Sequence, residues 1–190
     1  MNWILASGSP RRRELLEMLG VPDLTIRPAT GLERATPGAG PEQTVRELSL
    51  HKAQEVAQTC TPEDIIIAAD TIVYLDGAIL GKPKDHDDAV RMLTALSGRE
   101  HIVYTGVAVL RGGELRQAAE QTAVRFRALT PAEIERYIAT GEPMDKAGAY
   151  GIQGRGALFV AHLDGDYFNV MGLPLCRLGQ LLNELGVELL

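Results

Sequence analysis

Residues 3–19, WILASGSPRRRELLEML, predict a strand, a tight turn and a helix in direct succession. The apolar run 3–6 is typical of a short buried strand, and Ser7-Gly8 is typical of the turn that follows it. Ser9 stands at the expected N-cap of the helix, and Pro10 suits the first helical position. Such a strand-turn-helix unit is expected in a sheet that is covered by helices.

Three consecutive arginines, Arg11, Arg12 and Arg13, fall in the first turn of this helix. The free backbone N–H groups at a helix N-terminus attract anions, and a guanidinium binds phosphate through parallel hydrogen bonds. Positive charge at this end of a helix is unfavourable by about 0.3–1 kcal/mol, so a bound anion would offset it. We therefore expect Ser9, Arg11 and Arg12 to bind phosphate. The alternative is an ordinary solvated first turn.

The composition is that of an ordinary globular chain and limits the choice of partners. The 190 residues are 45% hydrophobic and 23% charged, which suits one domain that covers residues 1–190. A net charge of −6 disfavours broad binding to nucleic acid or to an anionic membrane. Since Arg11 to Arg13 are three of the 19 basic residues, a local positive site on an acidic body suits a small polyanionic ligand.

Two cysteines, Cys60 and Cys176, form neither a metal-binding spacing nor a disulfide framework. Such cysteines suit a reduced, cytoplasmic protein. The sequence shows no N-terminal signal pattern and no apolar run of about 18 residues that could span a bilayer. We therefore expect a cytoplasmic protein with no membrane partner.

Helix and strand patterns are mixed along the rest of the chain. The turns Asp76-Gly77 and Arg111-Gly112-Gly113-Glu114 predict two hairpins, and Thr130 and Glu133 form a capping box. These patterns predict an α/β fold, with a mixed sheet covered by helices and two lobes around a cleft. The expected strands cover residues 3–6, 24–27, 65–69, 72–75, 78–80, 101–110, 115–126 and 158–163; the expected helices cover 10–19, 42–58, 85–96 and 173–185, besides the one that the capping box opens and Gly141 closes.

Asp70 directly follows the apolar run 65–69, where a buried strand is expected to end. Ligands of open α/β sheets bind beyond the carboxyl ends of the strands. We therefore expect Asp70 to act as a metal ligand or general base, with a capping or turn aspartate as the alternative. Thr71 can turn its hydroxyl toward the same site.

Three further charged residues are weaker candidates. Lys82, within Gly81-Lys82-Pro83, can bind phosphate as a point charge, although an exposed turn lysine fits equally well. Lys52 lies near the apolar face of its helix, where it either snorkels to solvent or points into the site. Glu33 lies in the long loop 28–41, and long loops in compact domains are often functional.

Residues 145–154, DKAGAYGIQG, form the second informative segment. Its small residues let the backbone approach a ligand closely, and Gln153 can both donate to and accept from a base edge. For Tyr150, packing is the default expectation. The glycine spacing matches neither a dinucleotide-binding fingerprint nor a P-loop, and no zinc-binding histidine pair or nucleophile elbow occurs. Carboxylates are thus the available metal ligands, which favours a hard ion such as Mg²⁺.

Taken together and in order, these motifs resemble the Maf-family nucleoside triphosphate pyrophosphatases over residues 3–186. The resemblance implies the inosine triphosphate pyrophosphatase-like (Maf/Ham1) fold and cleavage of a nucleoside triphosphate into a monophosphate and pyrophosphate. The matching segments are Ser7 to Arg12, Ala69 to Thr71, Gly81 to Pro83, Ser97 to Arg99, Asp145 to Gly154, and Gly165-Asp166-Tyr167 through Gly172-Leu173-Pro174.

The resemblance also implies roles for individual residues. Asp70 matches the family's catalytic carboxylate. Arg12, Thr71 and Gln153 match positions tied to substrate choice, in a pattern similar to that of the branch acting on dTTP and UTP. Further polar positions that line the family's site match Glu33, Lys52 and Lys82.

A divalent metal ion, Mg²⁺ or Mn²⁺, completes the mechanism that we expect. Asp70 and Glu33 would hold the ion, which would neutralise charge on the leaving pyrophosphate. Water would attack the α-phosphorus, with Asp70 or a metal-bound hydroxide as the base. Both choices of base remain open at this point.

Two other functions fit the same residues. One is a pyrophosphatase for modified or non-standard nucleotides, and the other is a nucleotide-binding regulator of cell division with little turnover. In every case the expected partner is a small-molecule nucleoside triphosphate. A homodimer is an expectation from the family resemblance.

Overall fold

The computed structural model describes residues 2–32 and 34–190, and the chain divides into two compact units. Unit 1 holds residues up to Asp70, together with 105–120 and 172–190, and unit 2 holds 71–104 and 121–171. Three strands run from one unit into the other: β3 (Ile65–Leu75), β5 (Glu100–Arg111) and β6 (Glu114–Phe126). The cleft expected between two lobes stays a prediction.

The described strands form a mixed sheet, which confirms the predicted fold class. β1 (Trp3–Leu5) pairs in parallel with β2 (Thr25–Ile26) and with β3. β4 (Ala78–Leu80) pairs antiparallel with β3, and β7 (Val160–Asp164) pairs antiparallel with β6. The strand order is β2-β1-β3-β5-β6-β7, with β4 attached to β3.

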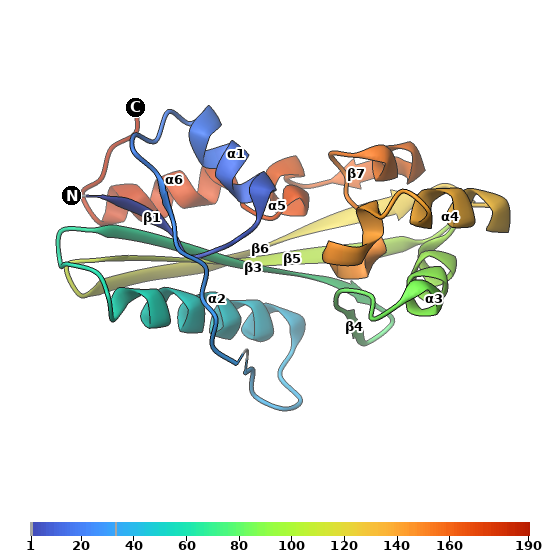
Figure 1. Cartoon of the computed structure of the whole chain (residues 1–190), viewed down its shortest axis with the longest axis horizontal. Coiled ribbons are helices and arrows are strands. Elements are labelled where there is room, and N and C mark those ends of the chain that lie inside the picture. Colours follow the sequence, from blue (N-terminus) through green and yellow to red (C-terminus); the bar gives the residue numbers. More distant parts are fainter. Residues whose placement is uncertain (1, 33) are drawn as a thin grey trace. The chain divides into compact units, whose positions relative to one another are not determined.

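Helices cover both faces of the sheet in unit 1. α2 (Pro41–Ala57) lies on one face, and α1 (Pro10–Met18) and α6 (Leu175–Glu184) lie on the other (Figure 1). A Cβ atom at Gly106 of β5 would lie 2.1 Å from the carbonyl oxygen of Val45 in α2, so the helix backbone approaches the sheet closely. The core cluster that includes residues of α2 is rich in small side chains: Ile4, Ala6, Ala53, Val56, Ile66, Ala68 and Ala108.

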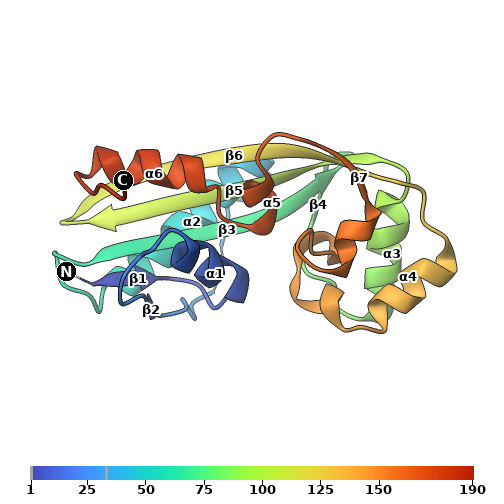
Figure 2. The same cartoon turned by 90° about the horizontal axis from the view of Figure 1, so that it is seen from above.

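Unit 2 packs α3 (His86–Leu96) beside α4 (Pro131–Ile138) (Figure 2). A buried aromatic cluster lies in this unit, in which the rings of His101, Phe126 and Tyr150 meet edge to face at centroid distances of 4.7 to 5.4 Å. The Tyr150 hydroxyl lies 2.8 Å from Nε2 of His101. The packing role expected for Tyr150 is thus confirmed.

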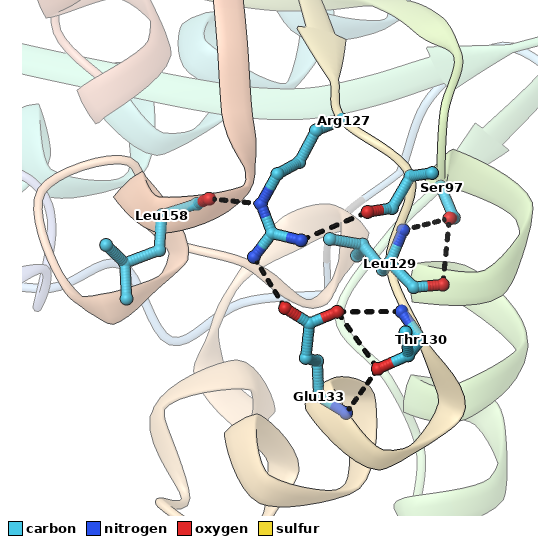
Figure 3. Close-up of polar contacts among 7 residues, drawn as sticks. Ser97, Arg127, Leu129, Thr130, Glu133 and Leu158 are labelled. Atoms are coloured by element: carbon cyan, nitrogen blue, oxygen red, sulfur yellow. Dashed lines mark hydrogen bonds and ion pairs between the residues drawn. The ribbon is translucent and has the colours of Figure 1, made fainter.

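The start of α4 shows the predicted capping box (Figure 3). The Thr130 hydroxyl accepts from the N–H of Glu133 at 3.3 Å, and the Glu133 carboxylate accepts from the N–H of Thr130 at 2.8 Å. Arg127 donates to the same carboxylate at 2.8 Å and to the carbonyl of Leu158 at 2.9 Å. Hydrogen bonds from Arg127 and Thr130 lower the pKa of Glu133 to about 2.

Three 3-10 turns follow α4, and a short helix precedes α6. The turns are η1 (Glu142–Asp145), η2 (Ala147–Ala149) and η3 (Arg155–Phe159), and the helix is α5 (Tyr167–Met171). Within the segment 145–154, η2 and the end of η1 form short 3-10 turns, and residues 150–154 are loop and turn. The strand expected at 158–163 begins only at Val160, because residues 158 and 159 belong to η3.

The prediction that a strand ends at residue 69 is wrong. The segments 65–69 and 72–75 form one continuous strand, β3, so Asp70 and Thr71 lie within it. Aspartate is depleted in strands, so an aspartate directly after an apolar run predicts that the strand has ended. The apolar pattern resumes at Ile72, and the chain stays extended through Asp70 because that side chain finds a partner across the core.

The described cysteines, Cys60 and Cys176, are free thiols, as expected. None of the helices in the described part of the chain combines the length and the apolar character that crossing a bilayer requires.

Candidate active site

The centre of the candidate site is an ion pair between Lys52 of α2 and Asp70 of β3, both in unit 1. Lys52 Nζ lies 2.5 Å from Asp70 Oδ1. The two side chains are only 16% and 11% exposed, respectively. Lys52 is therefore not a snorkelling surface lysine, and the pairing offsets the cost of burying either charge alone. It also explains how β3 accommodates an aspartate.

The donor set around Asp70 bears on whether a metal ion fits. Among residues 2–32 and 34–190, no three His, Cys, Asp or Glu side chains come together as a metal site. Glu33, the second expected ligand, lies outside the described residues. Mg²⁺ in phosphate-transfer sites is commonly held by one or two carboxylates together with substrate phosphates and water. The nearly buried Asp70 carboxylate fits that mode, with substrate supplying further oxygen atoms.

The loop 28–41 is tied to α2 by two carboxylates that the sequence analysis did not single out. Glu55 accepts from the backbone N–H groups of Thr30 at 2.7 Å and Gly31 at 3.0 Å, and Glu47 accepts from the N–H of Thr36 at 2.7 Å. These hydrogen bonds lower the pKa of both carboxyl groups. Helix α2 thus supplies Lys52 and also anchors the described loop residues on either side of position 33.

A small surface pocket lies next to Lys52. Residues of the anchored loop line one part of it and residues of α2 line the rest, among them Ala29, Gly31, Leu48, His51 and Glu55. Lys52 also lines this pocket, although its side chain is only 16% exposed.

The three arginines of α1 have different surroundings. Arg12 donates through Nε to the carbonyl of Gly172 at 2.7 Å and through Nη1 to the hydroxyl of Ser7 at 3.0 Å. Arg13 is exposed and pairs with Glu17 one turn later at 2.6 Å, so the alternative of a solvated helix turn holds for Arg13. Arg12 is instead oriented by the backbone of a segment 160 residues away. The role of Ser7 in fixing Arg12 was not predicted.

The beginning of α1 is where the sequence places it. Ser9 is the N-cap and Pro10 the first helical residue, but the Ser9 hydroxyl makes no capping hydrogen bond. The N–H of Ser9 donates to the Ser7 hydroxyl at 3.2 Å. Arg11 is half-buried beside this helix end. Ser9, Arg11 and Arg12 therefore share the first turn of α1, as the phosphate prediction requires.

Unit 2 brings two of the predicted segments together. The N–H of Gly148 donates to the carbonyl of Gly81 at 3.0 Å, which joins the segment 145–154 to Gly81-Lys82-Pro83. Lys82 and Gln153 are both exposed, and Thr71 is half-buried next to Asp70 in the chain. The two segments are thus in contact at Gly81 and Gly148.

The comparisons with known proteins agree with this arrangement of motifs. Residues 2–185 match the family model described as Maf-like protein. A dTTP/UTP pyrophosphatase from Moorella thermoacetica is 53% identical over 187 residues, which cover 97% of this chain and 95% of that protein. Another, from Symbiobacterium thermophilum, is 51% identical over 183 residues, which cover 96% of this chain and 93% of that protein.

A solved structure of a HAM1 protein from Coxiella burnetii is similar in fold. It aligns with a TM-score of 0.53 at 16% sequence identity, and covers 97% of this chain and 99% of that chain. At this identity the likeness concerns the fold alone. It agrees with the mixed α/β sheet seen here.

Proposed function

This chain belongs to the Maf family, and we propose that it is a pyrophosphatase for the nucleoside triphosphates dTTP and UTP. It hydrolyses a nucleoside triphosphate to the monophosphate and pyrophosphate. The observation that carries the proposal is the identity of about half of all positions with relatives named dTTP/UTP pyrophosphatase over nearly the whole chain. The nearly buried Lys52–Asp70 pair provides the charged groups that the proposed chemistry needs.

In the proposed mechanism, cationic groups bind and orient the polyphosphate. Arg11, Arg12 and the Ser9 hydroxyl form one such cluster at the start of α1, and Lys52 and Lys82 supply further ammonium groups. Arg12 suits this role because Ser7 and Gly172 already fix its guanidinium, so little side-chain entropy is lost on binding. Holding the reacting phosphate in place accounts for much of the rate enhancement in such reactions.

Asp70 is the proposed general base. A water molecule attacks the α-phosphorus and gives its proton to the Asp70 carboxylate, while the bond from that phosphorus to the bridging oxygen breaks and pyrophosphate leaves. The neighbouring Lys52 ammonium pairs with this carboxylate and stabilises negative charge that develops nearby. Lys52 is therefore proposed to act in binding and in transition-state stabilisation.

Asp70 and Glu33 are the residues that we propose to hold a divalent metal ion, Mg²⁺ or Mn²⁺. When bound, the ion would neutralise negative charge on the phosphates of the substrate and of the leaving pyrophosphate. The proposal is supported by the hard oxygen donor that Asp70 offers in a nearly buried position.

Arg12, Thr71 and Gln153 are the proposed determinants of substrate choice. The exposed amide of Gln153 can donate to and accept from the Watson–Crick edge of a pyrimidine at the same time. A site that forms such paired hydrogen bonds rejects bases with the wrong donor and acceptor pattern, since its own polar groups would be left unsatisfied.

The first test is a panel of canonical and modified nucleoside triphosphates, incubated with Mg²⁺ and assayed separately for pyrophosphate and orthophosphate. Pyrophosphate from dTTP and UTP, with little from purine nucleotides, is the expected result. Release mainly from modified nucleotides would favour a role in removing non-standard nucleotides. Nucleotide binding without turnover would favour a regulator and would overturn the proposed enzyme.

The matched variants are Asp70→Asn and Asp76→Asn. Asp70→Asn is expected to lower kcat at least a thousandfold and to leave nucleotide binding largely intact. Asp76 lies in the exposed turn between β3 and β4, where asparagine before Gly77 suits the same turn, so this control should keep full activity. Near-normal turnover by Asp70→Asn would contradict the assigned base.

We also propose, from the family resemblance, that the enzyme works in the cytoplasm as a homodimer. Light scattering on the purified chain measures the molar mass in solution and tests the dimer directly.

A further inference from the structure

Gln153 lies in a turn, and two side chains of unit 2, Tyr137 and Glu142, accept hydrogen bonds from the backbone of that turn. Glu142 Oε1 accepts from the N–H of Gly156 at 3.2 Å, and Glu142 Oε2 accepts from the N–H of Arg155 at 3.0 Å. The Tyr137 hydroxyl donates to Glu142 Oε1 at 2.8 Å and accepts from the N–H of Gly151 at 3.1 Å. Three backbone amides on both sides of Gln153 therefore converge on one carboxylate and one phenol.

The packing around these contacts leaves the turn little room to move. A Cβ atom at Gly154 would lie 2.4 Å from Glu142 Oε1, and one at Gly156 would lie 2.8 Å from the Tyr137 hydroxyl. The glycines thus let the backbone close directly onto the two side chains. Lys146 packs against Gly151, where a Cβ atom would lie 2.7 Å from Lys146 Cε, and its Nζ donates to the carbonyl of Glu142 at 2.7 Å.

The charge states of the two side chains suit these hydrogen bonds. Burial raises the pKa of the Glu142 carboxyl. The hydrogen bonds from the N–H of Arg155, the Tyr137 hydroxyl and the N–H of Gly156 together lower this pKa by more, so the net shift is downward. Burial raises the pKa of Tyr137, so its hydroxyl stays protonated and donates. The charged Glu142 carboxylate strengthens the three hydrogen bonds that it accepts.

We propose that Tyr137 and Glu142 are positioning residues that set base selectivity by fixing the Gln153 turn. The inference rests on the proposed function, in which Gln153 contacts the base. The two side chains bind backbone N–H groups on both sides of Gln153, so they would act through the placement of that residue. A turn held by three amides is pre-organised and loses little entropy when the base binds. A displacement of one hydrogen-bonding group is enough to weaken the discrimination between bases.

Tyr137→Phe and Glu142→Gln are the test variants, and Glu133→Gln is the matched control. Glu133 lies in the same unit, and its carboxylate also accepts backbone and side-chain hydrogen bonds, but these fix the start of α4 and Arg127 (Figure 3). The readout is the ratio of kcat/KM for dTTP to kcat/KM for dATP. We expect both test variants to lower this ratio about tenfold, and the control to change it less than about twofold.

A double-variant cycle with Gln153→Ala separates positioning from general weakening of the fold. If Tyr137 acts through Gln153, adding Tyr137→Phe to Gln153→Ala will not lower the ratio further. Independent, multiplicative effects would overturn the inference, as would a loss of kcat/KM that is equal for the two nucleotides. If Glu142→Gln does not fold, Tyr137→Phe alone carries the test, because it removes one oxygen and keeps the ring in its place.

Wild-type turnover separates a failure of this inference from a failure of the proposed function. If the unaltered chain releases no pyrophosphate, the proposed function fails, and the ratio is then taken from competitive binding of dTTP and dATP. Hydrogen exchange gives a second, activity-independent measurement. The amides of Gly151, Arg155 and Gly156 should exchange at least about tenfold faster in Tyr137→Phe and Glu142→Gln; unchanged exchange would overturn the positioning role.

Discussion

Replacing Lys52 with methionine removes the ammonium group that faces Asp70 and keeps a long apolar side chain. The charged atoms lie 2.5 Å apart, and the Asp70 side chain is only 11% exposed, so water can replace little of the lost interaction. We therefore expect Lys52→Met to destabilise the fold, in addition to any effect on phosphate binding.

The magnitude follows from the balance of Coulomb attraction and desolvation. At this separation and an effective dielectric constant of about 20, the attraction amounts to about 7 kcal/mol, and the desolvation of two charges offsets most of it. Removing one partner keeps the desolvation cost of the other, which typically costs about 3–5 kcal/mol. We expect about 3 kcal/mol for Lys52→Met, because both side chains retain some contact with solvent. The double variant Lys52→Met/Asp70→Asn should lose only about 1 kcal/mol.

The assay is urea unfolding of the wild type, both single variants and the double variant, followed by circular dichroism. With a slope of about 2–3 kcal/mol per molar urea, Lys52→Met should lower the midpoint by about 1–1.5 M. A loss below about 1 kcal/mol in Lys52→Met would refute the reasoning. So would a double variant whose loss equals the sum of the two single losses, since that result would mean that the two charges do not depend on each other.

The remaining predictions concern pH, packing and the metal ion. Burial lowers the pKa of His101 to about 4 in the folded chain, whereas a histidine in the unfolded chain is protonated below about pH 6.5. The free energy of unfolding should therefore fall by up to about 3 kcal/mol as the pH drops from about 6.5 to 4. In unfolding measured at pH 7 and pH 4.5, His101→Gln should lack this loss of stability. An equal loss in the variant would contradict the assignment of the loss to His101. Gly106→Ala should cost about 3 kcal/mol, because its Cβ would meet the Val45 carbonyl at 2.1 Å. Gly179 lies in α6, and a Cβ atom added there would have no other atom within 4 Å, so Gly179→Ala should raise stability by about 0.5–1 kcal/mol. Thermal unfolding of the Gly106→Ala and Gly179→Ala variants tests both expectations. EDTA should abolish pyrophosphate release and added Mg²⁺ should restore it, whereas activity that persists in EDTA would remove the metal ion from the mechanism.

Features that depend on neighbours within about four residues could be predicted from the sequence. The Asp76-Gly77 turn has positive φ angles of 50° and 83°, and these are the angles that its two residue types favour in a two-residue hairpin. The capping box of Thr130 and Glu133 forms because both partners lie in the first turn of α4. In both places the energy that decides the conformation is local, so a short window of sequence contains it.

Features that depend on distant partners could not be predicted in the same way. The position of Asp70 within β3 depends on Lys52, which comes from a helix 18 residues earlier. Helix periodicity placed Lys52 near the apolar face, but it could not show whether the ammonium reaches solvent or a buried carboxylate. Likewise, Arg12 is fixed by the backbone carbonyl of Gly172. Every residue has such a carbonyl, so the sequence cannot show which one will bind Arg12. The family resemblance supplied the candidate residues of the site, whereas the hydrogen-bond partners of Asp70 and Arg12 came from the structure.

The glycines of the segment 151–156 have an internal packing role that the sequence analysis did not predict. The sequence analysis attributed the small residues to close approach by a ligand, and the segment does contain the exposed Gln153. At Gly154 and Gly156, however, the nearby atoms include those of the protein's own Glu142 and Tyr137. The missing Cβ atoms are needed so that a carboxylate and a phenol can hold the backbone. A glycine-rich segment can therefore be well ordered, and here the tight internal packing is what makes a fixed placement of Gln153 physically reasonable.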